Sequence, residues 1–200
     1  MADIKISQLP LKTTPMGASD LLEVSEAQFL PNTFVSKKMR RDKLIETVFG
    51  NFPSGSFYEN TTQTATANTP TAMLISQTGF LNDVSLFGTT GIQVTNAGNY
   101  NLQFSAQVFR TTGSSSQHID IWLRVNGADV ANTNSRLNVN DHSIYHVPAW
   151  NWFIYLGATD YVEIMWATTT ANIELRFEVA NLTIPHPETP SVIATINRIG

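Results

Sequence analysis

Residues 98–110 alternate between apolar and polar side chains with a period of two. The apolar positions share one parity: Tyr100, Leu102, Phe104, Ala106 and Val108. Successive side chains of a β-strand point to opposite faces, so this pattern predicts a strand with one buried and one solvated face. The same alternation recurs over 118–125 and 173–179, and Asn126-Gly127, directly after the former, is a strong hairpin-turn signal. From about residue 79 onward, the chain is therefore predicted to be all-β and antiparallel.

Three further segments, 150–156, 161–166 and 192–199, carry large apolar side chains on both parities. A strand that is apolar on both faces is covered on both faces. One cover is the core of the domain, and the other is most simply a neighbouring copy of the chain, which predicts an oligomer. The candidate interface residues are Trp150, Trp152, Tyr155, Tyr161, Trp166, Ile193 and Ile196.

The first fifty residues differ from the rest in charge. They hold seven of the twelve Lys and Arg residues and six acids, whereas the remainder holds five Arg, no Lys and ten acids. Their apolar residues form only short stretches, with strand candidates at 20–24 and 34–36, and such pieces bury little by themselves. We therefore expect an irregular N-terminal anchoring segment over 1–55 and a β domain over 56–200, with the boundary at 53–55.

A short helix is expected over about 37–49, because apolar residues recur there at helical spacing and Gly50 stands at the position after its end. Its basic first turns have three interpretations: a solvated face, a contact with an acidic partner such as a capsid or tail protein, or a contact with nucleic acid. The second interpretation makes docking candidates of Lys37, Lys38, Arg40, Arg41, Lys43, Leu44, Ile45, Val48 and Phe49.

Composition excludes several classes of function. The net charge is −4, which disfavours nucleic acid as the main partner because phosphate contacts need a basic surface. The sequence contains no cysteine, so it has no disulfide framework and no thiolate metal site. No apolar run is long enough to cross a membrane, and the start of the chain does not resemble a signal peptide. We therefore expect synthesis in the cytoplasm without membrane insertion.

The sequence shows no arrangement of residues typical of an enzyme's active site, and no catalytic, metal or cofactor-binding residue is assigned. Asp141-His142-Ser143 are neighbours whose side chains point apart, so they cannot form a triad. His142 and His146 would lie roughly 13 Å apart along a strand, too far to share an ion. Two alternatives stay open: His146 meeting its own copies on a threefold axis, and a pair of carboxylates about 5–10 Å apart in a cleft between subunits, as in a glycosidase.

Trp122 is an unusual aromatic residue because it falls on the polar parity of its strand. It shares that face with His118, Asp120 and Arg124. One interpretation is a ligand site in which the indole stacks on a sugar ring. The other is that Trp122 packs at a subunit interface or under a loop.

The order of these segments resembles the jelly rolls of complement C1q and tumour necrosis factor. The resemblance is carried by 91–108, with its Gly-x-Tyr-x-Leu-x-Phe run, by the hairpin at 123–127 and by Gly157-Ala-Thr-Asp160 within 156–164. It covers about 72–200 and implies a ten-stranded jelly-roll domain that forms a homotrimer. The sequence departs from that pattern in having no collagen stem before the domain, and the calcium-binding acids of some members have no counterpart in it.

The N-terminus has a second resemblance. Ile4-Lys-Ile-Ser-Gln-Leu-Pro10, then Ser19–Ser25, then the Lys-rich stretch into Leu44-Ile45, looks like the leader of bacteriophage fibre and decoration proteins, and the ending over 185–196 is similar to proteins of the same type. This resemblance implies a non-enzymatic virion protein, anchored to a capsid or tail protein through residues 1–50.

Three functions follow as hypotheses. The first is a trimeric head fibre or capsid decoration whose jelly roll projects outward, with host-surface or environmental glycans as candidate ligands. The second is a short tail fibre that attaches the particle to its host. The third, of a different class, is a free glycan-binding module that belongs to no particle.

Overall fold

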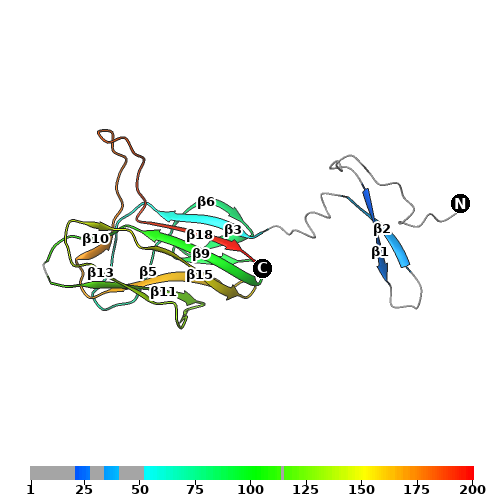
Figure 1. Ribbon diagram of the computed structural model, residues 1–200, viewed down its shortest axis with the longest axis horizontal. Coiled ribbons are helices and arrows are strands. Elements are labelled where there is room, and N and C mark those ends of the chain that lie inside the picture. Colours follow the sequence, from blue (N-terminus) through cyan, green and yellow to red (C-terminus); the bar gives the residue numbers. More distant parts are fainter. Residues whose placement is uncertain (1–20, 28–33, 41–51, 114) are drawn as a thin grey trace. The chain divides into compact units, whose positions relative to one another are not determined.

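The computed structural model describes residues 21–27, 34–40, 52–113 and 115–200. The chain divides into two compact units, Met1–Asn51 and Phe52–Gly200. Every regular element in the described residues is a β-strand (Figure 1). The prediction of an all-β class is confirmed.

The described residues of the first unit form one antiparallel pair of strands. Strand β1 (Leu21–Ala27) pairs antiparallel with β2 (Phe34–Arg40), in a register that sets Leu21 opposite Arg40 and Ala27 opposite Phe34. The two short strands expected near residues 20 and 34 are therefore present.

The prediction of a helix over 37–49 is wrong for its first four residues. Lys37 to Arg40 continue β2 and pair with Leu21 to Val24 of β1. Phe34 and Val35 favour extended backbone at the start of this strand. A run of positive charge in the first turn of a helix would also oppose the helix dipole. Residues 41–49, with the other docking candidates, lie outside the described residues.

The second unit is built on two large antiparallel sheets. The first has the strand order β15-β9-β18-β3-β6. Its strands are β15 (Ala149–Leu156), β9 (Gly98–Ala106), β18 (Val192–Arg198), β3 (Ser54–Glu59) and β6 (Gln77–Asn82). The N-terminal strand β3 and the C-terminal strand β18 are neighbours, so the two ends of the unit are held in one sheet.

The second large sheet has the order β12-β11-β16-β8-β7, with β13 also paired to β11 and β5 to β16. Its strands are β12 (Ala128–Asp129), β11 (His118–Val125), β16 (Tyr161–Thr168), β8 (Gly91–Val94), β7 (Val84–Phe87), β13 (Ser135–Asn138) and β5 (Thr71–Ala72). A smaller sheet joins β14 (Tyr145–His146), β10 (Val108–Arg110), β17 (Ile173–Leu175) and β4 (Gln63–Thr64). Together the sheets form an antiparallel jelly-roll sandwich (Figure 1).

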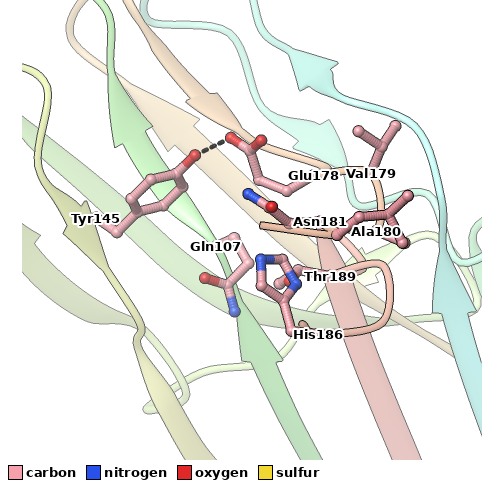
Figure 2. Close-up of a pocket in the computed structure, with 9 residues that line it drawn as sticks. Gln107, Tyr145, Glu178, Val179, Ala180, Asn181, His186 and Thr189 are labelled. Atoms are coloured by element: carbon pink, nitrogen blue, oxygen red, sulfur yellow. Dashed lines mark hydrogen bonds between the residues drawn. The ribbon is translucent and has the colours of Figure 1, made fainter. Parts of the chain in front are cut away.

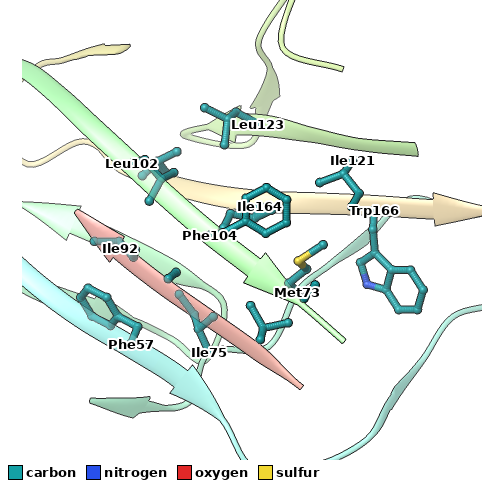
Figure 3. Packing of buried hydrophobic residues seen from close by; sticks show 14 of the residues in the cluster. Phe57, Met73, Ile75, Ile92, Leu102, Phe104, Ile121, Leu123, Ile164 and Trp166 are labelled. Atoms are coloured by element: carbon teal, nitrogen blue, oxygen red, sulfur yellow. The ribbon is translucent and has the colours of Figure 1, made fainter. Parts of the chain in front are cut away.

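The core lies between the two large sheets. Leu102 and Phe104 of β9 meet Ile121 and Leu123 of β11, and all four are buried (Figure 3). These residues occupy the apolar parities found in the sequence, so the predicted in-and-out alternation of both strands is confirmed. Burial of each such side chain stabilises the folded state by about 1.5–3 kcal/mol. The alternation decides which side chains are buried in this way, so it is the main determinant of the sandwich.

The strand expected over 173–179 is shorter than its pattern. Strand β17 ends at Leu175, and Val179 is 70% exposed. The backbone N–H of Arg176 still donates to Gln107, but the chain then leaves the sheet as a hairpin arm, residues 178–189, closed by a pairing of Glu178 with Thr189. The apolar–polar alternation of the sequence runs on to Val179, but no neighbouring strand in the described part of the chain pairs with residues 176–179.

Candidate functional site

One outer surface of the sandwich carries no charged side chain on four adjacent strands. The cross-strand registers place one outward-facing set on β15, β9, β18 and β3. Its members are Ala149, Asn151, Phe153, Tyr155, Asn99, Asn101, Gln103, Ser105, Ile193, Thr195, Asn197, Ser54, Ser56 and Tyr58. We call this set the uncharged face. Depletion of charge is what distinguishes the centre of a protein–protein interface from ordinary surface.

The uncharged face also exposes large apolar side chains. Phe153 is 71% exposed, Tyr155 67% and Ile193 40%. Hollows of about 200 and 260 Å³ lie on either side of Gln103, one towards Ile193 and the other towards Asn151. Two of the predicted interface residues, Tyr155 and Ile193, lie on this face.

The other predicted interface residues lie elsewhere. Trp152, Trp166 and Ile196 are buried in the core of the single chain. Trp150 is half-buried and packs edge-on against Phe104 at 4.7 Å between ring centroids. These side chains point inward because their parity faces the opposite sheet.

The remaining candidate, Tyr161, lies on the other large sheet. Its ring stacks on Phe87 of β7 with centroids 4.1 Å apart. Tyr161 is therefore separated from the uncharged face by the thickness of the sandwich.

The opposite outer surface carries the predicted ligand-binding residues. His118, Asp120, Trp122 and Arg124 all lie on β11 with their side chains on the outward parity. The imidazole Nε2 of His118 lies 3.6 Å from a carboxylate oxygen of Asp120. The structure thus brings the four residues onto one face, as their spacing implied.

Two residues from neighbouring strands complete this cluster. Arg136 of β13 donates from Nε and Nη2 to the two carboxylate oxygens of Asp120, both at 2.9 Å. Asp129 of β12 accepts at one oxygen from the indole N–H of Trp122, at 2.8 Å, and from Nε of Arg124, at 3.0 Å. Each carboxylate therefore has its own arginine.

A groove of about 380 Å³ lies beside the indole of Trp122. We call it the Trp122 groove, and its lining residues are Asp120, Trp122, Asp129, Val130, Ala131, Asn132, Asn134 and Ala167. The segment 129–134 was not among the ligand-binding residues assigned from the sequence. The Asn126-Gly127 turn was the available signal, because a tight hairpin there places Asp129 opposite Arg124.

The electrostatics of the groove keep both carboxylates ionised. The hydrogen bonds from Arg136 lower the pKa of Asp120 below its ordinary value. The indole of Trp122, followed by Arg124, lowers the pKa of Asp129. A glycosidase needs one carboxyl group with a raised pKa to act as general acid. Asp120 and Asp129 are suited to accept hydrogen bonds from a ligand and poorly suited to donate a proton to a leaving group.

A second pocket, of about 560 Å³, lies at the base of the hairpin arm (Figure 2). The hydroxyl of Tyr145 donates to Glu178 there, and Gln107 and His186 also line it. Burial, followed by the hydrogen bond to Glu178, raises the pKa of Tyr145. The arm itself exposes apolar side chains, with Leu182 93% exposed.

The three neighbours considered as a catalytic triad lie at the surface. Asp141, His142 and Ser143 are all exposed. In the described part of the chain, no three His, Cys, Asp or Glu side chains are grouped so that they could hold a metal ion. No helix within the described ranges is long and apolar enough to cross a membrane.

Comparison with known proteins gives structural likeness without sequence likeness. No family model matches the chain, and no curated protein matches it. Among solved structures, it is similar to the Eiger TNF of S. frugiperda, at 11% identity over 75% of this chain and 94% of that one, with a TM-score of 0.48. Murine APRIL at pH 8.5 is similar at 11% identity over 74% and 99%, with a TM-score of 0.47. The jelly-roll assignment itself rests on the strand pairing and core of this chain.

Proposed function

We propose that this protein is a non-catalytic, homotrimeric appendage of a bacteriophage particle. Its N-terminal unit docks onto a capsid or tail protein, and its jelly roll projects from the surface as a head fibre or decoration. The observation that carries the self-association is the uncharged face, where Phe153 and Tyr155 are 71% and 67% exposed among uncharged neighbours.

Burial of the uncharged face against other copies would remove its aromatic rings from water. Each square ångström of apolar surface buried is worth roughly 25 cal/mol, and no charged side chain belongs to the uncharged face that would have to be desolvated in exchange. Closed rotational symmetry gives every copy the same contacts and leaves no free interface. The resemblance to C1q and tumour necrosis factor jelly rolls supports three as the number of copies.

Docking onto a particle is supported by the N-terminal sequence. The leader-like segments within residues 1–50 and the excess of basic residues there distinguish this unit from the acidic jelly roll. Lys37, Lys38 and Arg40 lie on β2, and we propose that they contact an acidic surface of the particle. The virion is accordingly the proposed location.

Light scattering on the purified chain tests the assembly. We expect the mass of three 22.1-kDa chains at micromolar concentration. A well-behaved monomer would contradict the proposal, because the aromatic side chains of the uncharged face would then be left in water.

Electron microscopy of intact particles tests the location. We expect three-lobed projections on the head that disappear when the encoding phage lacks residues 1–51, the first of the two units. Projections on the tail, with purified protein competing for adsorption to host cells, would favour the tail-fibre alternative. A protein absent from purified particles would contradict a virion role and favour the free glycan-binding module.

A further inference from the structure

The indole of Trp122 is held as a fixed platform at the edge of the Trp122 groove. Its N–H is committed to Asp129 at 2.8 Å, which sets the direction of the ring. The residue paired with Trp122 on the adjacent strand is Met165 of β16, which lies on the same face and is 1% exposed, so the surface beside Trp122 on that side is closed. An aromatic ring with few rotatable bonds offers contact area at low entropic cost.

The polar groups of the groove surround this platform. Both hydrogen bonds to Asp129 use one oxygen, Oδ1, so the other carboxylate oxygen can accept from a ligand. Asn132 and Asn134 add amide groups that can both donate and accept. Ala167 lies at the groove with only a methyl group, which leaves room beside the indole.

The wall of the groove is anchored on both sheets. The hydroxyl of Thr133 donates to the carbonyl of Val130 at 2.7 Å and accepts from the N–H of Leu123 at 3.1 Å. The carbonyl of Thr133 accepts from the indole N–H of Trp152, on the opposite sheet, at 3.1 Å. A wall that is already fixed loses little conformational freedom when a ligand binds.

The charges of the groove indicate the charge of its ligand. Asp120 is paired with Arg136 and Asp129 with Arg124, so two anions and two cations offset one another. Phosphate or carboxylate ligands need a surplus of donors with positive charge, which this groove lacks. A ligand with one apolar face and many hydroxyl groups fits better, because hydroxyls can donate to ionised carboxylates and accept from amides.

From these features we infer that the Trp122 groove binds a neutral saccharide, whose ring stacks on Trp122 while its hydroxyl groups bond to Asp129 and the amides of Asn132 and Asn134. This inference names the ligand class of the proposed appendage. It rests on the proposed function only for avidity, since three linked grooves would strengthen a weak contact through effective concentration.

The first experiment screens the full-length protein on immobilised neutral oligosaccharides of glucose, galactose, mannose and N-acetylglucosamine. Sialylated and uronic acid-containing oligosaccharides serve as acidic comparisons. We expect binding to at least one neutral oligosaccharide, followed by calorimetry with that compound in solution. Binding to acidic compounds alone, or to none at all, would overturn the inference.

Substitutions then locate the site. Trp122→Ala should weaken binding of the selected oligosaccharide about tenfold or more, because the stacking surface is lost. Ala167→Leu provides an independent test, since it fills the groove and removes no hydrogen bond. Leu182→Ala, at an exposed apolar residue of the hairpin arm, is the matched control and should bind as the unaltered protein does. Unchanged binding in both groove variants would overturn the site, and thermal melts confirm that each variant is folded.

A monomeric variant separates this inference from the proposed assembly. Phe153→Asp alters the uncharged face and leaves the groove intact. We expect it to keep the affinity for a soluble oligosaccharide and to lose retention on the immobilised one. If the unaltered protein proves monomeric yet binds through Trp122, the saccharide site stands and the proposed trimer fails.

Discussion

The two outer faces of the jelly roll follow the same alternation in sequence and differ in what that alternation exposes. On β9 and β15, the outward positions are amides, hydroxyls and aromatic rings without charge. On β11, the outward positions hold two charged residues, a histidine and a tryptophan, and neighbouring strands supply partners for the charges. The parity of a residue therefore predicts whether its side chain faces outward. The charge of the outward residues then indicates whether the face is suited to contact another protein or a small ligand.

The difference has a physical basis in desolvation. Removing an ionised side chain from water costs several kcal/mol unless it is paired and hydrogen-bonded, so a surface meant for broad burial does best without charges. A groove that stays wet and binds a small hydroxylated ligand can keep its charges, provided that they are paired, as Asp120 is with Arg136. Four predictions test this distinction.

The largest effect is expected from a charge on the uncharged face. Phe153→Asp places a carboxylate where the proposed trimer buries an aromatic ring, at a cost of several kcal/mol in each copy. Light scattering should show the mass of one chain. Ser135→Asp, an exposed position on β13 of the other sheet, is the control and should keep the mass of three. A trimeric Phe153→Asp variant would show that the uncharged face is not the interface.

The second largest effect is expected from a substitution that creates a cavity in the core between the two sheets. Phe57 is fully buried, so Phe57→Ala should lower the free energy of unfolding by about 3–5 kcal/mol in denaturant titrations. Phe80→Ala removes the same ring from a site that is 57% exposed and should change stability by less than about 0.5 kcal/mol. Equal losses in the two variants would contradict the assignment of the core.

A smaller effect is expected where the two sheets are joined by a hydrogen bond. Trp152→Phe keeps an aromatic ring against Phe104 but removes the donor to Thr133, and should cost about 1–2 kcal/mol. It should also weaken saccharide binding a few-fold, with the assembly unchanged. Trp150→Phe is the matched control, because the buried indole N–H of Trp150 has no hydrogen-bond partner among the described residues. A larger loss of stability in the control would contradict the importance of the bond.

The smallest effect is a pH-dependent one at the charged face. The pKa of Asp120 is lowered by Arg136 in the folded chain, so the pair stabilises the protein above the unfolded-state pKa of about 3.9. That stability is lost as the pH falls through the lower, folded value. Asp120→Asn should therefore lower the free energy of unfolding at pH 7 by about 1 kcal/mol at most, which is seen as a lower Tm, and this gap to the unaltered protein should close as the pH falls through the folded pKa. Asp141→Asn, at an exposed carboxylate elsewhere, should change Tm little, and a gap that widens in acid would contradict the pairing.

Much of the jelly roll could be predicted from periodicity alone. The inward residues of β9 and β11 occupy the predicted parities because burial of one face requires them to. Where both parities were apolar, as around Trp152 and Trp166, periodicity could not say which residues met the opposite sheet. The exposed rings of Phe153 and Tyr155 became distinguishable only once the cross-strand registers were known.

The candidate site was predicted only in part. The four residues of β11 share a face by simple alternation. The position of Asp129 on β12 follows from the tight turn at Asn126-Gly127, whereas that of Arg136 on β13 depends on how the chain folds back further along, which no local pattern determines. The helix prediction was wrong over Lys37 to Arg40 for a related reason, because pairing with β1 decided their conformation over their local preference.

The hairpin arm is also suited to carrying foreign sequence. Near its tip, Asn181 pairs with His186, and the side chain of Asn181 accepts from the N–H groups of Thr183 and Ile184. An insertion after Thr183 would interrupt only this local turn and would leave every sheet hydrogen bond in place. A peptide epitope grafted there would be displayed once per chain, on an arm that projects from the sheets (Figure 1).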